Sequence, residues 1–276
     1  MPLVINTNVA SLEAQRNLGI AQGRLGKSFQ RLSSGFRINS AADDAAGLAV
    51  SESMRAQIRS YTVAERNANN GISMTQTAEG GLGQISSILI RMRELSVQAA
   101  NGDLTSTDRG FIDTEFQLLK LELERLAEST EFNGKELLAG TDFTIDFQVG
   151  INTTSFDTIS VRFGGVSIST FGLSASGVGG ADATAALAAI DAVDAAFTTV
   201  STARAGFGAA QNRMEVSVLN TQAIRANLSA AHSRIRDVDV AAETSALARS
   251  QVLLQAGTSV LSQANQQPQV ALQLLQ

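Results

Sequence analysis

Residues 190–235 carry the most regular pattern in the chain and read IDAVDAAFTTVSTARAGFGAAQNRMEVSVLNTQAIRANLSAAHSRI. One column of side chains, apolar except at Thr221, recurs in this stretch at every seventh position. The column consists of Val193, Val200, Phe207, Met214, Thr221, Leu228 and Ile235. A seven-residue repeat keeps one face of a helix against a neighbouring helix. The pattern therefore predicts a helix over 184–235 whose apolar column lies in the core of a rod.

A second long helix is predicted upstream, from about residue 44 to residue 100. Its seven-residue column consists of Met54, Tyr61, Ala68, Thr75, Leu82 and Leu89. Ser40-Ala-Ala-Asp43 has the form of a capping box, which predicts that the helix begins near residue 41. Asn101-Gly102 predicts where it ends.

A third helix follows, because Thr105-Ser-Thr-Asp108 is another capping box and precedes an apolar stripe at helical spacing. The stripe consists of Ile112, Phe116, Leu119, Leu123 and Leu126, and we take Phe116, Leu119 and Leu123 as rod-core residues. Three long helices with facing stripes predict a mainly α fold, an elongated antiparallel helical bundle or coiled coil.

The apolar period changes to two between residues 143 and 163. Apolar side chains at Phe143, Ile145, Phe147 and Val149, and again at Ile159, Val161 and Phe163, alternate with polar ones. This alternation predicts one β-hairpin whose apolar face lies on the helices. Residues 164–181 are rich in Gly and Ser, which predicts a flexible or irregular connection to the last long helices.

The two ends of the chain carry a further seven-residue spacing. It comprises Leu18, Leu25 and Leu32, with Phe29 beside them, and then Val240, Leu247, Leu254 and Leu261. After Arg249 no charged side chain occurs, and the polar positions are Gln, Ser, Thr and Asn. Uncharged amides suit a surface that is buried yet hydrogen-bonded, as in a subunit interface. We therefore expect the terminal helices to order when many copies pack together.

Composition argues against several classes of function. The net charge of −5 disfavours nucleic-acid binding, which requires a basic face. With no Cys and one His, His232, thiolate and His-rich metal sites are excluded. The carboxylate pairs Asp43/Asp44 and Asp237/Asp239 are interpreted as helix caps. We expect no catalytic, cofactor or metal site, no cleaved signal peptide and no membrane-spanning helix.

Several segments of the chain resemble bacterial flagellins. The most distinctive is Arg31-Leu-Ser-Ser-Gly-Phe-Arg-Ile-Asn-Ser-Ala-Ala-Asp-Asp-Ala-Ala-Gly-Leu-Ala-Val. Similar matches occur at Val4–Asn8, Arg66–Ser73, Arg93–Asn101, Glu131–Gly134, Gln211–Arg213, Ser233–Asp239 and Gln255–Gln266. These matches occur in the same order as in the family and cover about residues 1–150 and 182–276. The short segment 164–181 stands where other flagellins carry large outer domains, so the chain resembles a minimal member of the family.

The resemblance implies five segments. These are an N-terminal inner-core helix over 1–40, a rod part with two helices and the hairpin over 41–163, a variable segment over 164–181, a rod helix over 182–236 and a C-terminal inner-core helix over 237–276. The terminal helices would pair as an inner coiled coil through the assembly residues Leu18, Leu25, Phe29, Leu32, Val240, Leu247, Leu254 and Leu261. The implied function is a non-enzymatic structural subunit that polymerises into the helical flagellar filament used for swimming.

The resemblance also implies partners and a location. The partners would be other copies of the chain, alone or mixed with other flagellins, the hook–filament junction and cap proteins, and the export chaperone with its type III apparatus. The filament would be extracellular, with export that removes no signal peptide. Arg91, Leu95 and Glu115 match positions that a host flagellin receptor contacts, and 30–51 resembles the epitope sensed by plants. Neither nucleic-acid binding nor membrane insertion is implied.

Three alternatives remain open at this stage. A hook–filament junction protein shares the terminal helices, although a minimal middle disfavours it. An enzyme or ligand-binding domain on a helical rod would need a polar pocket that no catalytic set here lines. A general coiled-coil scaffold would leave the charge-free C-terminus unexplained.

Overall fold

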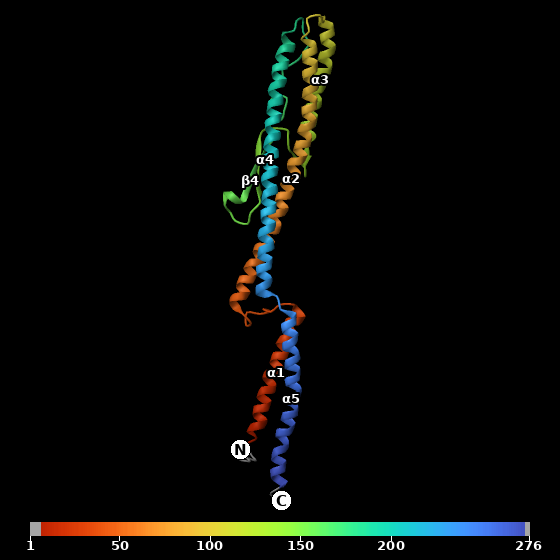
Figure 1. The fold of residues 1–276 in the computed structure, drawn as a ribbon. Helices are drawn as coiled ribbons and strands as arrows, with labels where there is room; N and C mark the ends of the chain where they lie inside the picture. Colours follow the sequence, from red (N-terminus) through yellow and green to blue (C-terminus); the bar gives the residue numbers. More distant parts are fainter. Residues whose placement is uncertain (1–6, 274–276) are drawn as a thin grey trace. The chain divides into compact units, whose positions relative to one another are not determined.

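The structure is a computed structural model that describes residues 7–273, with side chains through Gln266. The start of the Val4–Asn8 motif and the last residues of the predicted 237–276 segment lie outside the described residues. The long helices are α1 (Val9–Ser34), α2 (Ala45–Ala99), α3 (Ser106–Ser129), α4 (Thr184–Arg236) and α5 (Val240–Gln273). The strands are β1 (Glu131–Phe132), β2 (Lys135–Glu136), β3 (Phe143–Gln148) and β4 (Thr158–Phe163), with a 3-10 turn, η1 (Ser155–Asp157), before β4. The predicted mainly α fold with a β-hairpin is confirmed (Figure 1).

The chain divides into two compact units. The terminal unit contains the residues up to Ile58 and those from Ala226 onward, and the central unit is Arg59–Arg225. In the terminal unit α1 packs antiparallel to α5 (Figure 1). Gly35 ends α1 in the left-handed conformation, with φ 74°, which a glycine adopts without strain. The chain can then pair with the segment that leads into α5, where Phe36 and Asp237 form an isolated antiparallel bridge.

Helix α2 begins later than predicted. Ser40 to Asp43 form a turn instead, in which the Asp43 carboxylate accepts hydrogen bonds from the Ser40 N–H and hydroxyl. These bonds hold the pKa of Asp43 below its ordinary value. The next residue, Asp44, caps the helix by accepting from Gly47 N at 2.8 Å, and α2 starts at Ala45. Two adjacent aspartates therefore divide the turn and the cap between them.

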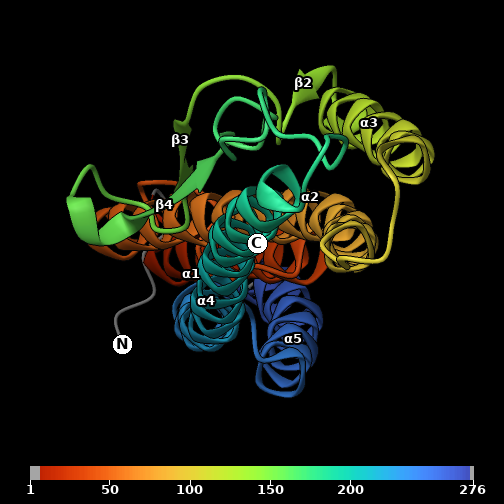
Figure 2. The same ribbon diagram turned by 90° about the horizontal axis from the view of Figure 1, so that it is seen from above.

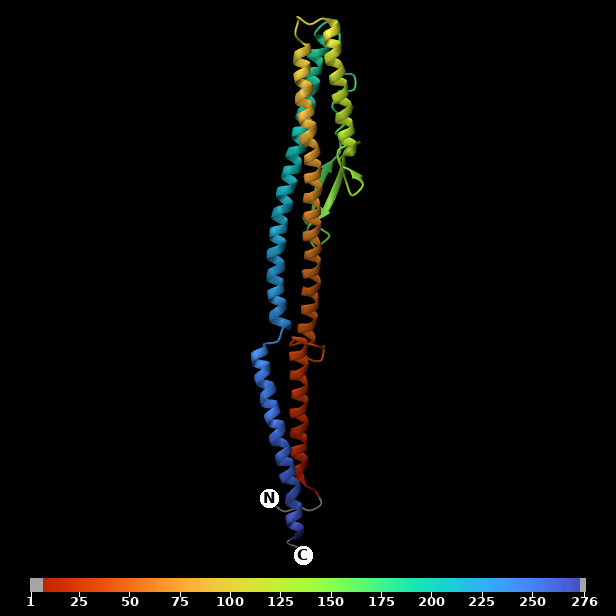
Figure 3. The same cartoon turned by 90° about the vertical axis from the view of Figure 1, so that its right-hand side faces the viewer.

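In the central unit α2 and α4 run antiparallel, and α3 and the β3–β4 hairpin follow one another along that pair (Figures 2 and 3). The predicted capping box of α3 is confirmed, with Thr105 and Asp108 each accepting from the other's backbone N–H. Strands β3 and β4 pair antiparallel from Phe143↔Phe163 to Gln148↔Thr158. The hairpin packs its apolar face on the helices, and the Phe163 ring lies 5.2 Å from that of Phe207 on α4.

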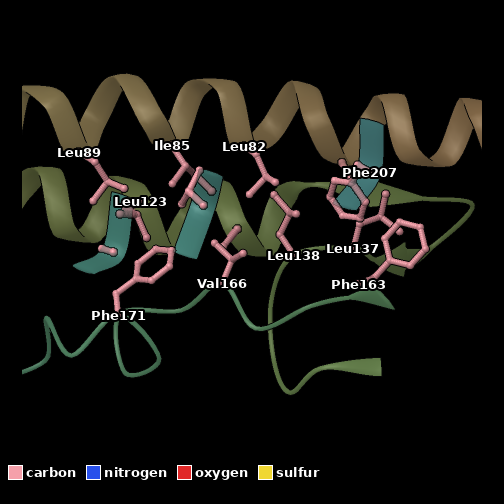
Figure 4. Close-up of a cluster of buried hydrophobic side chains, with 14 of the residues drawn as sticks. Leu82, Ile85, Leu89, Leu123, Leu137, Leu138, Phe163, Val166, Phe171 and Phe207 are labelled. Carbon is pink, nitrogen blue, oxygen red and sulfur yellow. The ribbon is translucent and has the colours of Figure 1, made fainter. Parts of the chain in front are cut away.

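The 164–181 segment is irregular, as predicted, yet its apolar side chains are built into the core. Val166, Phe171, Leu173 and Val178 are almost completely buried. They belong to the same core as Leu82, Ile85, Leu89 and Leu123, and Figure 4 shows Val166 and Phe171 beside these residues of α2 and α3. Of the two forms expected for this connection, flexible or irregular, the structure shows the irregular one, anchored by these buried side chains.

Candidate assembly surfaces

The terminal unit is held together by the leucine spacing seen in the sequence. Leu18, Leu25 and Leu32 of α1 and Leu247, Leu254 and Leu261 of α5 are each half-buried. The two helices approach each other closely at Gly257, where a Cβ atom would lie 3.0 Å from Leu18 Cδ1. A glycine at this point lets the helices pack closely. Each of the six leucines nevertheless keeps part of its surface open.

Polar groups tie the same two helices at both ends of the pair. Asn8 Nδ2 donates to the Ala264 carbonyl at 2.8 Å, and Ser11 Oγ donates to Asn265 Oδ1 at 2.8 Å. At the other end Arg31 pairs with Glu243 at 3.5 Å. Uncharged amides and hydroxyls thus hold α5 where charged residues are missing from its sequence.

Both terminal helices expose large apolar side chains among polar ones. Val9, Leu12 and Ile20 are exposed on α1 and, at 100° per residue, lie within about 80° of one another around the helix. Val252, Leu253 and Val260 are exposed on α5. Two predicted inner-core residues, Phe29 at 53% and Val240 at 58%, are also exposed in the single chain. Exposed apolar side chains gathered on one side of a helix favour a surface that a partner covers.

The predicted rod core divides between the two units. Val193, Val200, Phe207 and Met214 of α4 and Phe116 and Leu123 of α3 are almost completely buried in the central unit, and Leu119 packs at the edge of that core. Leu228 and Ile235 belong to the terminal unit, where they are half-buried. The column therefore continues past Thr221, but its burial decreases.

Arg91 and Glu115 form an exposed ion-pair cluster between α2 and α3. Arg91 Nε donates to Glu115 Oε1 at 2.9 Å, and its Nη1 donates to Glu94 at 3.0 Å. These hydrogen bonds raise the pKa of Arg91 above its ordinary value. Leu95, the third predicted receptor contact, is only 2% exposed and belongs to the core. It can support that surface from beneath but does not present a side chain to a partner.

A second exposed ion pair links α2 and α4. Arg93 donates from Nε and Nη2 to the two carboxylate oxygens of Asp194, at 2.7 and 3.3 Å. The two-point contact lowers the pKa of Asp194 and raises that of Arg93. Because both side chains are about half exposed, the pair contributes little to stability.

Three of the carboxylates considered for chemistry, Asp43, Asp44 and Asp239, accept hydrogen bonds from nearby backbone N–H groups. Asp239 Oδ1 accepts from Ala241 N and Ala242 N and so caps α5, as Asp44 caps α2. Within residues 7–273 no three His, Asp or Glu side chains converge in a way that would hold a metal ion. The lone histidine, His232, is half-buried near the end of α4.

Helix α4 also passes a simple test for a membrane-spanning segment. One of its 18-residue windows reaches a mean hydropathy of 1.2, counted over the described residues. Length and composition alone are weak evidence, since the core helix of a bundle passes the same test. Here the apolar column of α4 packs against the other elements of the central unit.

Two buried cations on α3 escaped the sequence analysis. Arg109 donates to the carbonyls of Ala99, Asn101 and Ala181, so that it joins the end of α2 to the start of α4. Lys120 Nζ donates to the Ser174 and Ser176 carbonyls at 3.3 and 3.0 Å. The signal was present in the sequence, because both residues lie at helical spacing from Phe116 on the apolar stripe. A cation within such a stripe requires buried acceptors.

Comparison with known proteins shows the family to which the chain belongs. The model of the bacterial flagellin N-terminal helical region matches residues 5–142, and that of the C-terminal helical region matches 190–275. The flagellin of Halalkalibacterium halodurans is 46% identical over 273 residues, which cover 99% of this chain and 100% of the relative. The chain belongs to the bacterial flagellin family.

Other members of the flagellin family are similar over nearly their whole length. The flagellin of Bacillus subtilis is 41% identical, covering 98% of this chain and 99% of the relative. The flagellar filament 33 kDa core protein of Treponema phagedenis is 39% identical, covering 99% and 100%. A crystal structure of Bacillus cereus flagellin aligns with TM-score 0.48 and 29% identity over 56% of this chain and 88% of that one.

Membership of the flagellin family gives the chain its role. It is a short, structural subunit of the bacterial flagellar filament, the extracellular organelle of swimming motility, and its main partner is another copy of itself. The two family models leave residues 143–189 unmatched, the region that contains the β3–β4 hairpin and the irregular segment.

Proposed function

We propose that the exposed faces of α1 and α5 are the surfaces that neighbouring copies cover in the filament core, and that both helices gain order on incorporation. The observation that carries this proposal is the exposure of large apolar side chains on one antiparallel helix pair, among them six aliphatic ones besides Phe29 and Val240: Val9, Leu12 and Ile20 on α1 and Val252, Leu253 and Val260 on α5. The eight inner-core residues predicted from the sequence, Phe29 and Val240 included, lie on this same pair.

The energetics favour the same assignment. A fully buried Val, Leu or Ile side chain contributes roughly 1.5–3 kcal/mol. Since the six side chains are each about half exposed, covering them would contribute roughly 5–9 kcal/mol per subunit before the cost of association. In a single subunit these side chains remain exposed and the stabilisation is absent. In a polymer each subunit would gain it.

The rest of the chain follows from this assignment. The segments 1–40 and 237–276 would form the inner core, 41–163 and 182–236 the surrounding rod, and 164–181 a short variable segment. The filament then needs no catalytic or cofactor site in this subunit, and we assign it no enzymatic activity. We place its release outside the cell on the flagellar export route, with the export chaperone holding the C-terminal helix and no leader peptide removed.

Further partners are proposed from the family resemblance. The junction protein of the hook and the filament cap would bound the polymer at its two ends. A host flagellin receptor would meet the exposed Arg91–Glu115 pair of a dissociated subunit. Arg91→Glu should then weaken receptor activation by soluble subunits, and unchanged activation would remove this pair from the contact.

Seeded polymerisation tests the main proposal. Dissociated subunits are returned to neutral pH with short filament fragments, pelleted and viewed by electron microscopy. Val252→Asp, at an exposed position of α5, should leave the helix content of the free subunit unchanged and abolish pelleting, because a charge would be buried without a partner. Val252→Thr, of nearly the same shape and uncharged, is the matched control and should pellet. Pelleting by both variants would show that this face stays in solvent.

The alternatives give different results in the same assay. A hook–filament junction protein would add to seeds once and stop, and few copies would occur in isolated filaments. A coiled-coil scaffold would form small soluble oligomers without seeds. Long filaments of the full chain alone favour the subunit assignment.

A further inference from the structure

The turn of the β3–β4 hairpin presents a phenyl ring to solvent. Phe156 is 94% exposed, more than any other large hydrophobic side chain among the described residues. Its loop is tightly hydrogen-bonded: the Asp157 carbonyl accepts from Val149 N at 2.8 Å and from Gly150 N at 3.0 Å. Gln148 Nε2 also donates to the carbonyls of Gly150 and Asn152. The ring is thus held outward on a braced turn, an arrangement that suits insertion into a partner.

The central unit also contains an open groove with an apolar lining. The groove has a volume of about 540 Å³ and lies where β4 and the start of the 164–181 segment meet α4. Leu138, Val161, Val166 and Phe207 contribute buried side chains to it. A cavity of about 150 Å³ lined by aliphatic and aromatic side chains is sufficient for a benzene ring. The groove therefore has room for a phenyl group and for part of the loop that carries it.

The α4 side of the groove is less polar than its sequence suggests. Thr198, Thr199 and Thr202 line it, and each hydroxyl donates to the carbonyl four residues earlier in the helix. With the hydroxyls bound to the helix, the methyl groups remain for contact. Gly206 leaves open space beside them, with no atom within 4 Å of the position that a Cβ would take.

The exposed ring does not fill the groove of its own chain, because Phe156 is 94% exposed and is not among the residues that line the groove. Phe156 lies in the turn between Gln148 and Thr158, whereas the groove is lined by the later part of β4, from Ser160 to Arg162. A ring and a groove at different places on one subunit form a heterologous pair, which propagates from copy to copy in an open polymer.

Charge is complementary between the two surfaces. Asp157 lies beside the exposed ring and has no basic partner within residues 7–273. On the groove, Arg162 is paired with Asp142, whereas Arg213 has no acidic partner in the described part of the chain. A negative turn would thus approach a surface that carries one unpaired positive charge.

We propose that Phe156 of one copy inserts into this groove of a second copy, with Asp157 directed toward Arg213, and that the contact joins subunits outside the terminal helices. The proposal rests on the filament function, because that function supplies the neighbouring copy. It adds a specific contact made by the hairpin region that the two family models leave unmatched.

Thiol cross-linking tests the contact directly, since the chain contains no cysteine. Filaments are grown from an equal mixture of Phe156→Cys and Gly206→Cys subunits and treated with a short bismaleimide. We expect covalent dimers in the mixed filaments and none in filaments of either variant alone. Gly208→Cys, also on α4 with open space around it but outside the groove lining, is the control and should give no dimers.

Filling the groove gives a second, independent measurement. Gly206→Leu occupies the open space and replaces a helical glycine with a better helix former, so the subunit should fold as before. It should raise the critical concentration for polymerisation about tenfold or more, as should Phe156→Ala. Gly208→Leu, the matched control, should polymerise as the wild type does.

The outcomes separate this contact from the filament function itself. If the wild type forms no filaments, the filament function fails. If filaments form but the mixed sample yields no dimers, or if Gly206→Leu and Phe156→Ala polymerise with unchanged critical concentrations, the hairpin contact is wrong and the filament function stands.

Discussion

The loss of unfolding free energy caused by Phe207→Ala can be estimated from the structure. Helix α4 also carries a second, more exposed phenylalanine, Phe197, which serves as a control. Phe207 is 3% exposed and its ring lies 5.2 Å from that of Phe163. Truncating a buried Phe to Ala costs about 3–5 kcal/mol, of which the aromatic pair supplies about 0.5–1.5 kcal/mol. Phe197, at 40% exposure, has much less contact to lose, so Phe197→Ala should cost under about 1.5 kcal/mol.

Urea unfolding of dissociated subunits, followed by circular dichroism, measures the two free energies. For a unit of this size, 3–5 kcal/mol corresponds to a decrease in Tm of roughly 6–20 °C. Equal free energies for the two variants would refute the reasoning, since the core of the central unit would then not depend on the apolar column of α4. A fall in the m-value would show that the denatured state had changed as well.

Three further predictions concern the central unit. Gly71→Val should destabilise it by about 1–3 kcal/mol in thermal melts, because a Cβ there would lie 3.0 Å from the Phe147 ring. Lys120→Met should speed proteolytic cleavage within residues 164–181, since the Ser174 and Ser176 carbonyls both lose the hydrogen bond from Lys120. The pKa of Asp194 is lowered from 3.8, so its ion pair stabilises the fold above that pH and is lost as the pH falls through the lowered value; Asp194→Asn should flatten this part of an acid titration of stability.

The helices were predictable because their column spacing is a direct consequence of packing. Val193, Val200, Phe207 and Met214 recur every seventh residue because α4 needs one apolar face, and no long-range information is required to see it. The β3–β4 hairpin was predictable because apolar and polar side chains alternate along both strands, which gives each strand one apolar face. The start of α2 was not, because Ser40 and Asp44 are two possible capping residues four positions apart. Only the three-dimensional turn decides between them.

The candidate surfaces were harder to predict than the fold. Exposure of Phe29 and Val240, and burial of Leu95, depend on which side of a helix its neighbours occupy. Gly and Ser predicted a flexible or irregular segment at 164–181, and its packing depends on contacts with α2 and α3, far away in the sequence. The groove proposed to receive the exposed Phe156 ring could not be predicted from the sequence either, because residues of β4, the irregular segment and α4 line it together.

The hydrogen-bond acceptors of the two buried cations affect how the stability of the subunit depends on pH and salt. Arg109 and Lys120 are held by carbonyl oxygens, which gain no proton in mild acid, whereas the ion pairs whose pKa values shift lie on the surface. Added salt likewise weakens exposed pairs far more than buried contacts. Low pH and high salt should therefore each weaken the surface ion pairs of this protein first. The hydrogen bonds of Arg109 and Lys120, which join α2, α3 and the irregular segment, should persist under both conditions.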